Sequence, residues 1–169
     1  VLTETLAILR YLHATYPQAG LLPADALTEA RGWEWLSWLS SHVQSYAFMQ
    51  VFYPVRFGGD EAAQAVVEAN GRALLEEAWA DLEARLPATG FALGAFSVVD
   101  PHLLTFFRWA KRYGFYPQRR YPKWAALANR VLAQEPVATV FTDEGINLHD
   151  PLPPRPAHLK PIPADAMQP

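Results

Sequence analysis

Apolar and polar positions recur along most of the chain with the three- and four-residue spacing of α-helices. The stripe Leu75, Trp79, Leu82 and Leu86 is one example, with the spacing of a helix face that packs on a core. Such stripes, interrupted by Gly and Pro, predict helices over about residues 4–15, 28–52, 60–86, 98–113 and 122–133, and a short last helix from Pro136. The apolar run FALGAF at 91–96 is short and glycine-flanked, so we interpret it as a loop. The expected fold class is all-α.

Two further helices have predicted core faces, and one helix has an ambiguous surface. The predicted core positions are Leu103, Phe106, Phe107 and Ala110 in one helix and Trp124, Leu127, Ala128 and Val131 in another. In the long helix over 28–52, Trp33, Trp35 and Trp38 point in different directions, because successive residues turn by about 100°. This helix is either a central core helix or a helix with a core face and an interface face.

Composition narrows the classes of function. The 169 residues carry a net charge of −3 and no cysteine, which argues against a nucleic-acid footprint and excludes disulfides and thiolate zinc sites within the chain. No apolar run approaches the roughly 18 residues of a membrane span. The histidines lack the spacing of metal ligands, so we expect no metal. From the charge and the lack of a long apolar run, we expect no membrane and no nucleic acid as partners, and a cytoplasmic location. The Pro-rich segment 149–169 is expected to be extended, either packed on the surface or disordered.

The segment FSVVDPHLL contains a predicted capping box. Ser97 stands three residues before Asp100, so its hydroxyl is expected to accept from the Asp100 amide while the carboxylate accepts from the Ser97 amide. Pro101 falls within the first turn, where a missing N–H costs least. We interpret Ser97 and Asp100 as structural residues.

The first turn of the first predicted helix, LTETLAI, has two interpretations. In the first interpretation, Thr3 or Thr5 caps the helix, and the negative charge of Glu4 interacts favourably with the positive end of the helix dipole. Alternatively, the exposed amides and hydroxyl receive an anion while Glu4 receives an ammonium group, as a site for an amino-acid-like end of a ligand would require.

Three segments together resemble the cytosolic glutathione transferases, in particular bacterial beta-class-like members. LTETLAILRYL resembles the family segment L-[TS]-E-S-x-A-I-x-x-Y-L, and GAFSVVDPHLLTFFRWA resembles the capped core helix G-x-x-S-x-A-D. RYPKWAALANRVLAQEPVATVFTDEG resembles the closing helices. In addition to these three, EWLSWLSSHVQSYAF resembles the long fourth helix of bacterial beta-class-like members. Departures are Thr5 for the usual Ser, Gln44 for a frequent His and Val99 for a common Ala.

The resemblance implies a thioredoxin-like N-terminal domain followed by an all-α domain. On this basis, residues 1–16 are expected to be the last helix of the first domain, 17–27 a linker, 28–148 the helical domain and 149–169 a tail. The remainder of the thioredoxin-like domain, with the family's catalytic residue, is expected to lie outside this chain, which therefore holds no catalytic residue.

The resemblance also implies a function and site residues. Glutathione is the expected co-substrate, with its γ-glutamyl end at Glu4 and Thr5, and its thiolate attacks a small hydrophobic electrophile or a peroxide, a detoxification reaction. The expected second-substrate wall is Gln44, Phe48, Trp109 and Tyr113, for which core packing is the alternative. A homodimer is expected. The rival interpretation is a non-catalytic module of the same fold, used for interaction or assembly.

Overall fold

The computed structural model describes residues 1–146, and these residues form helices without a named strand. The α-helices are α1 (Thr5–Thr15), α2 (Ala26–Trp38), α3 (Met49–Phe52), α4 (Glu61–Arg85), α5 (Val99–Arg112), α6 (Pro117–Arg120), α7 (Pro122–Leu132) and α8 (Glu135–Asp143). Two 3₁₀ turns, η1 (Pro17–Ala19) and η3 (Pro54–Arg56), and one π-helix, η2 (Leu39–Phe48), complete the order. The predicted all-α class is confirmed; the predicted tail at 149–169 lies outside the described residues.

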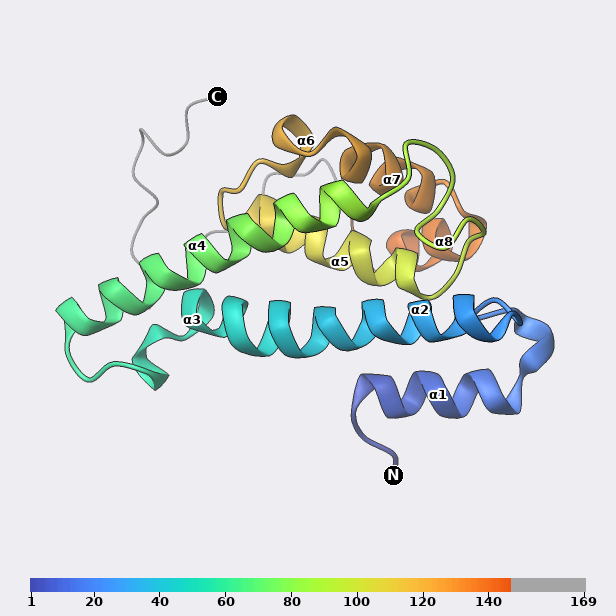
Figure 1. The fold of residues 1–169 in the computed structure, drawn as a ribbon, viewed down its shortest axis with the longest axis horizontal. Helices are drawn as coiled ribbons and strands as arrows, with labels where there is room; N and C mark the ends of the chain where they lie inside the picture. Colours follow the sequence, from blue (N-terminus) through green and yellow to red (C-terminus); the bar gives the residue numbers. More distant parts are fainter. Residues whose placement is uncertain (147–169) are drawn as a thin grey trace.

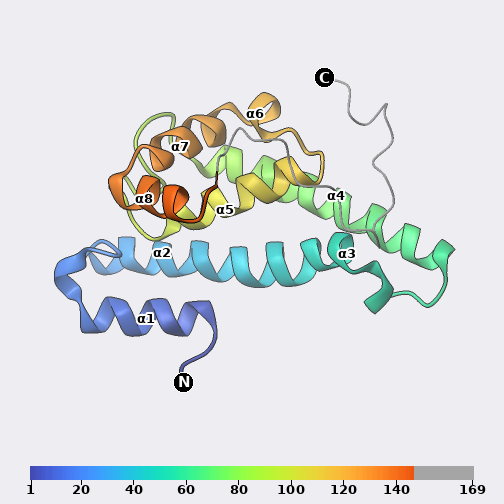
Figure 2. The same cartoon turned by 180° about the vertical axis from the view of Figure 1, so that it is seen from behind.

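The longest elements form a hairpin that supports the remaining helices. α2, η2 and α3 run as one rod, and α4 returns beside it (Figure 1). α5 packs against α2 on one side and against α7 on the other, so it occupies the interior of the bundle. α1 lies along the rod on the side away from α4, as the front and back views show (Figures 1 and 2).

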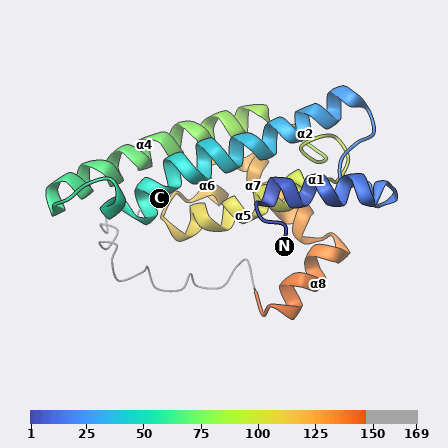
Figure 3. The ribbon, with the colours of Figure 1, turned by 90° about the horizontal axis from the view of Figure 1, so that it is seen from below.

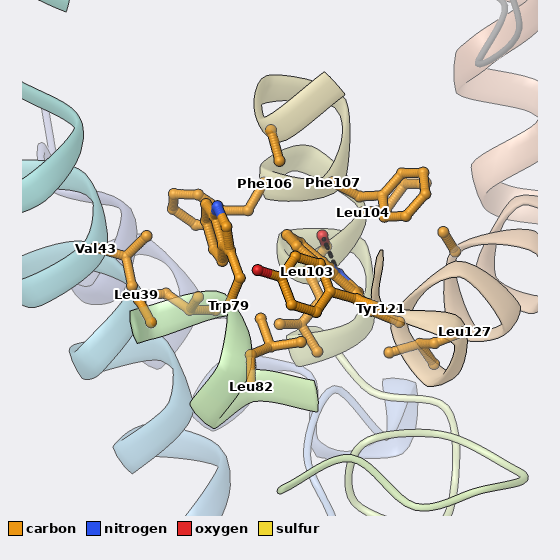
Figure 4. Packing of buried hydrophobic residues seen from close by; sticks show 14 of the residues in the cluster. Leu39, Val43, Trp79, Leu82, Leu103, Leu104, Phe106, Phe107, Tyr121 and Leu127 are labelled. Carbon is orange, nitrogen blue, oxygen red and sulfur yellow. Dashed lines mark hydrogen bonds between the residues drawn. The ribbon is translucent and has the colours of Figure 1, made fainter. Parts of the chain in front are cut away.

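The core is built from the stripes that the sequence indicated. Trp79 and Leu82 of α4 meet Leu103 and Phe106 of α5 in the centre (Figure 4). All the predicted core positions of α4, α5 and α7 are buried. The indole Nε1 of Trp124 in α7 donates to the Leu103 carbonyl oxygen at 3.1 Å, which satisfies a polar atom inside this apolar region.

The structure differs from the prediction along the rod. α2 begins at Ala26 rather than Thr28, because Asp25 caps it by accepting from the Thr28 amide at 2.8 Å. The predicted long α-helix changes to a π-helix over Leu39–Phe48, where the Ser45 hydroxyl donates to the carbonyl five residues earlier at 2.8 Å. The short helix α6 was not predicted, because four residues carry no measurable periodicity.

The three tryptophans of the rod contact different parts of the chain. Trp35 is buried beneath Arg85 of α4, whose guanidinium carbon lies 3.9 Å from the ring centroid. The same guanidinium lies 5.3 Å from Trp38, and the half-buried Trp33 meets His13 of α1 edge to face. The spread of these aromatics is therefore matched by packing within the chain itself.

A buried carboxylate fixes the start of α5. The Asp100 carboxylate accepts from the Ser97 amide and the Ala92 amide, both at 2.8 Å, and from the Ser97 hydroxyl at 3.2 Å. The predicted box is confirmed, with one correction: the Ser97 hydroxyl accepts from the Val99 amide at 3.4 Å and not from that of Asp100. Burial raises the pKa of Asp100, and the hydrogen bonds from Ala92 and Ser97 oppose this shift.

The Asp100 carboxylate should contribute more to stability than the Ser97 hydroxyl. Asp100→Ala leaves the buried Ser97 amide and the partly buried Ala92 amide without their acceptor, so we expect a loss of about 2–4 kcal/mol of unfolding free energy. Ser97→Ala removes only the hydroxyl and should cost about 1 kcal/mol. Urea unfolding measures both, with the exposed hydroxyl of Thr105 on the same helix as control, where Thr105→Ala should change stability by at most about 0.5 kcal/mol. Equal losses for Ser97→Ala and Asp100→Ala would contradict this ranking.

Gly71 allows α4 to cross the rod closely. A Cβ at this position would lie 2.7 Å from Gln50 Cβ and 3.0 Å from the Ala47 carbonyl oxygen. We expect Gly71→Ala to lower the unfolding free energy, since overpacking costs about 1–3 kcal/mol and the backbone oxygen cannot move aside. This exceeds the gain of about 1 kcal/mol in helix propensity.

Thermal and urea unfolding would test this, with Gly59→Ala as the matched control. A Cβ at Gly59 meets no atom within 4 Å, so its replacement should leave stability unchanged or slightly higher. A Gly71→Ala protein as stable as the wild type would show that the crossing of the two helices can widen without loss.

Candidate functional site

The N-terminal end of α1 is an open helix terminus. Glu4 is its N-cap residue, with no side-chain capping hydrogen bond in this described turn, and both Glu4 and Thr5 are exposed. The view from below shows α1 lengthwise, with this end next to the label N (Figure 3). The first amides of a helix lack intrahelical acceptors and carry the positive end of the dipole, so this end can receive an anion.

The backbone at Glu4 is unusual for a residue with a side chain. Its φ is 68° and its ψ is 119°, a left-handed conformation that costs a non-glycine residue about 1–3 kcal/mol. Neither Thr3 nor Thr5 caps the helix, so the purely structural interpretation of the threonines is wrong for this structure. The Glu4 carbonyl still accepts the first helical hydrogen bond, from Ile8 at 3.0 Å.

Three of the four predicted wall residues lie in one aromatic cluster. The Phe48 ring centroid lies 5.4 Å from that of Trp109 and 6.1 Å from that of Tyr113. Phe52, which the prediction missed, lies 5.4 Å from Trp109 and 4.7 Å from Tyr113. The spacing of Phe48 and Phe52, one helical turn apart, was the signal that could have identified it.

The members of this cluster differ in exposure. Phe48 is 0% and Tyr113 5% exposed, as expected if these two residues pack in the core, which was the alternative to a role in the substrate wall. Trp109 is half-buried at the edge of the cluster, whereas Gln44 is exposed on the π-helix. The structure therefore groups the aromatic residues and leaves Gln44 outside their ring contacts; a substrate-binding role stays a prediction for all four.

A pocket of about 380 Å³ lies between α5 and α8, and sequence analysis did not anticipate it. It is lined mainly by apolar side chains, with Arg108 and Glu144 as its charged members. The Arg108 guanidinium carbon lies 5.5 Å from the Phe141 ring centroid. None of the predicted wall residues lines this pocket: Gln44 and Phe48 lie on the rod itself, and the rings of Trp109 and Tyr113 contact Phe48 there.

Other chemistry is sparse in the described part of the chain. Burial lowers the pKa of His102 on α5, so its imidazole is neutral near pH 7. Residues 1–146 contain no group of three or more His, Cys, Asp or Glu placed to hold a metal ion. Among the same residues, no helix has the length and apolar character to cross a bilayer.

Comparison with known proteins gives matches in structure. No protein-family model matches the sequence, and no curated protein does. A glutathione transferase homologue from Sulfitobacter, solved with bound glutathione, has 26% identity and a TM-score of 0.76, over 86% of this chain and 69% of that one. The beta-class glutathione S-transferase of Sphingomonas chungbukensis has 28% identity and a TM-score of 0.69 over the same shares.

A sphingomonad glutathione S-transferase complexed with glutathione is similar to the same extent, with 29% identity, a TM-score of 0.70, and coverage of 86% of this chain and 69% of that one. These matches agree with the three sequence segments that carried the resemblance and with the all-α arrangement of the described helices. The chain therefore has the fold of the C-terminal helical domain of bacterial glutathione S-transferases.

Proposed function

We propose that the protein is a glutathione transferase and that the first turn of α1 holds the γ-glutamyl end of glutathione. The observation that carries the proposal is this uncapped helix start, where exposed Glu4 adopts a φ of 68° beside exposed Thr5. The α-carboxylate would accept from the free amides and the Thr5 hydroxyl, and Glu4 would pair with the α-ammonium. Support comes from similar structures that contain glutathione.

The proposed reaction is attack of the glutathione thiolate on a small hydrophobic electrophile or a peroxide. With an electrophile, sulfur forms a bond to the electrophilic atom, and the displaced electron pair leaves with a leaving group or takes up a proton. With a peroxide, sulfur bonds to one oxygen while the O–O bond breaks and the other oxygen leaves as an alcohol or water after taking up a proton; a second glutathione thiolate then attacks that sulfur, which releases the first oxygen as water after protonation and gives glutathione disulfide. A lower thiol pKa raises the thiolate fraction near neutral pH. The described residues contribute binding here, and no catalytic group is assigned among them.

For the second substrate, Trp109 is the strongest of the four candidates. Its half-buried indole lies at the edge of the cluster that Phe48, Phe52 and Tyr113 form, so it offers an apolar surface on a rigid support. Gln44 would add a polar group from the π-helix. Since the cytosol maintains a reduced glutathione pool, we also propose a cytoplasmic location.

Substitutions at the first turn of α1 test the proposal. Glu4→Gln removes the counter-charge of the ammonium, and Thr5→Ala removes a hydroxyl donor to the carboxylate. Each lost charged hydrogen bond is worth roughly 1.5–3 kcal/mol, so calorimetric titration of glutathione into the full-length protein should give a Kd about 10- to 100-fold higher.

Thr5→Ser is the matched control, because it keeps the hydroxyl and should bind almost as the wild type does. Thermal unfolding of each variant separates a loss of affinity from a loss of folded protein. Equal affinities in the wild type, Glu4→Gln and Thr5→Ala would end the assignment of this turn to glutathione.

An exposed aromatic surface favours assembly, either as a homodimeric enzyme or as the rival non-catalytic module. On the rod, the half-buried Trp38 stacks on His42 with ring centroids 6.3 Å apart, and the tilted Tyr46 ring lies 5.9 Å from that of His42. Tyr46 is 51% exposed and His42 is also exposed. Because aromatic side chains are enriched in the buried centre of interfaces, this exposure favours a partner surface. We propose that this surface meets the same surface of a second copy.

Light scattering of the full-length protein at micromolar concentration should give the mass of a dimer. Tyr46→Asp places a charge in the proposed contact, so it should shift the mass towards that of a monomer. Leu27→Asp, at the other end of the rod and 70% exposed, should leave the dimer intact. A wild-type protein that remains monomeric would contradict the assembly proposal and leave the glutathione proposal unaffected.

A further inference from the structure

The C-terminal half of α5 carries a group of cationic side chains that lie close together. Lys111 and Arg112 stand three and four residues after Arg108, so both are its neighbours on the helix surface. Burial and, second to it, the charge of Arg108 lower the pKa of Lys111. No aspartate or glutamate occurs between Asp100 and Glu135. This stretch of the chain therefore supplies no counter-charge to its own cations.

Contacts in the described residues account for Arg108 but not for Arg112. The Arg108 guanidinium lies against the Phe141 ring and lines the pocket beside α8 together with Glu144. The Nε atom of Arg112 is buried and has no hydrogen-bond partner among residues 1–146. A buried donor of a charged group is costly to leave without an acceptor, and a guanidinium has the planar donor fork that fits a carboxylate or another oxyanion. Arg112 therefore has an unused donor of the kind that binds oxyanions.

The position of Arg112 on the helix explains its charge but not its unsatisfied donor. Arg112 is the last residue of α5, where a cation interacts favourably with the negative end of the helix dipole. That interaction requires a positive charge near the helix end and no buried Nε atom. The carbonyl of Tyr113, the next residue, already accepts from Arg72 of α4 at 3.0 Å. A role at the helix end alone therefore leaves the Nε donor of Arg112 unexplained.

Arg112 shares a face of α5 with Trp109, the strongest candidate for binding the second substrate. Trp109 stands three residues before Arg112, a spacing that places the two Cβ atoms about 5–6 Å apart on the helix surface. The half-buried indole of Trp109 offers an apolar aromatic surface at the edge of the cluster. A ligand on that surface would have a polar substituent within reach of Arg112. An aromatic surface beside a guanidinium fits an apolar compound that carries an oxyanion.

We propose that Arg112 makes the second-substrate site selective for electrophiles that carry a carboxylate or another oxyanion, an inference that rests on the proposed function. The apolar part of the substrate lies on Trp109, and its anionic group accepts from Arg112. The chemistry takes place at another atom of the substrate: with an aryl chloride, the sulfur–carbon bond forms, the carbon–chlorine bond breaks, and chloride leaves with the electron pair. An acidic residue of the full-length protein is the alternative partner of Arg112.

Two glutathione conjugates that differ in one charge test this selectivity. Para-chloro-meta-nitrobenzoate and the corresponding benzamide each give an S-aryl conjugate with glutathione, one with a carboxylate and one with a neutral carboxamide of nearly the same shape. Calorimetry measures the Kd of glutathione and of each conjugate for the full-length wild type, Arg112→Gln and Arg112→Lys. Arg119→Gln is the matched control, because it removes the same charge from an exposed position on α6. The unfolding temperature of each protein is also measured.

The wild type should bind the carboxylate conjugate at least about threefold more tightly than the carboxamide conjugate, as expected for a partly exposed charged pair. Arg112→Gln should abolish this preference. Arg112→Lys should retain part of it, because an ammonium keeps the charge but lacks the planar fork. Arg119→Gln should behave as the wild type does. Glutathione itself should bind with the same Kd to all four proteins.

Four other outcomes would each overturn the inference. Equal binding of both conjugates to the wild type would show that the site does not select oxyanions, and would leave the glutathione proposal intact. A preference that survives in Arg112→Gln would overturn the role of Arg112. A lower unfolding temperature in Arg112→Gln, with equally weakened binding of both conjugates, would show that an acidic residue of the protein is its partner. A wild type that binds neither glutathione nor either conjugate would overturn the proposed function, and this inference with it.

Discussion

The buried carboxylate of Asp100 is the interaction on which the arrangement of the described chain depends. It accepts from Ala92 and Ser97, so it ties the loop before α5 to the first turn of the central helix. In the same turn, the Val98 amide donates to the Leu21 carbonyl at 2.9 Å, which attaches the connection between α1 and α2. The loop before α5 and the connection between α1 and α2 are distant in sequence but meet at the start of α5. The hydrogen bond between Val98 and Leu21 therefore fixes the position of the α1–α2 connection.

This arrangement divides the described residues into a buried interior and a peripheral helix, α1. α4, α5 and α7 share fully buried aromatic and aliphatic side chains, whereas α1 buries none of its residues. The strained backbone at Glu4 lies at the exposed start of this helix, so hydrogen bonds to a bound ligand there would offset the cost of its φ of 68°.

The sequence predicted the fold class and the core because burial imposes a periodic pattern, and Trp79 and Phe106 follow it. The capping box was predictable because its partners are local. The uncapped start of α1 was not, since a positive φ at a glutamate has no signal in the sequence. Likewise, contact between Phe52 and Trp109 depends on how distant helices cross, which apolar spacing alone does not specify.

The π-helix Leu39–Phe48 has a consequence for comparing this chain with its relatives. Each residue in a π-helix turns by less than in an α-helix, so the two α-helical ends of the rod are out of phase with a continuous α-helix. π-Helical turns behave as an inserted residue in an otherwise α-helical sequence. A gapless alignment through this segment can therefore match residues that face different directions. Transfer of a role to Gln44 by counting along the helix thus requires superposition of backbones, and deletion of one residue here would rotate α3 relative to α2.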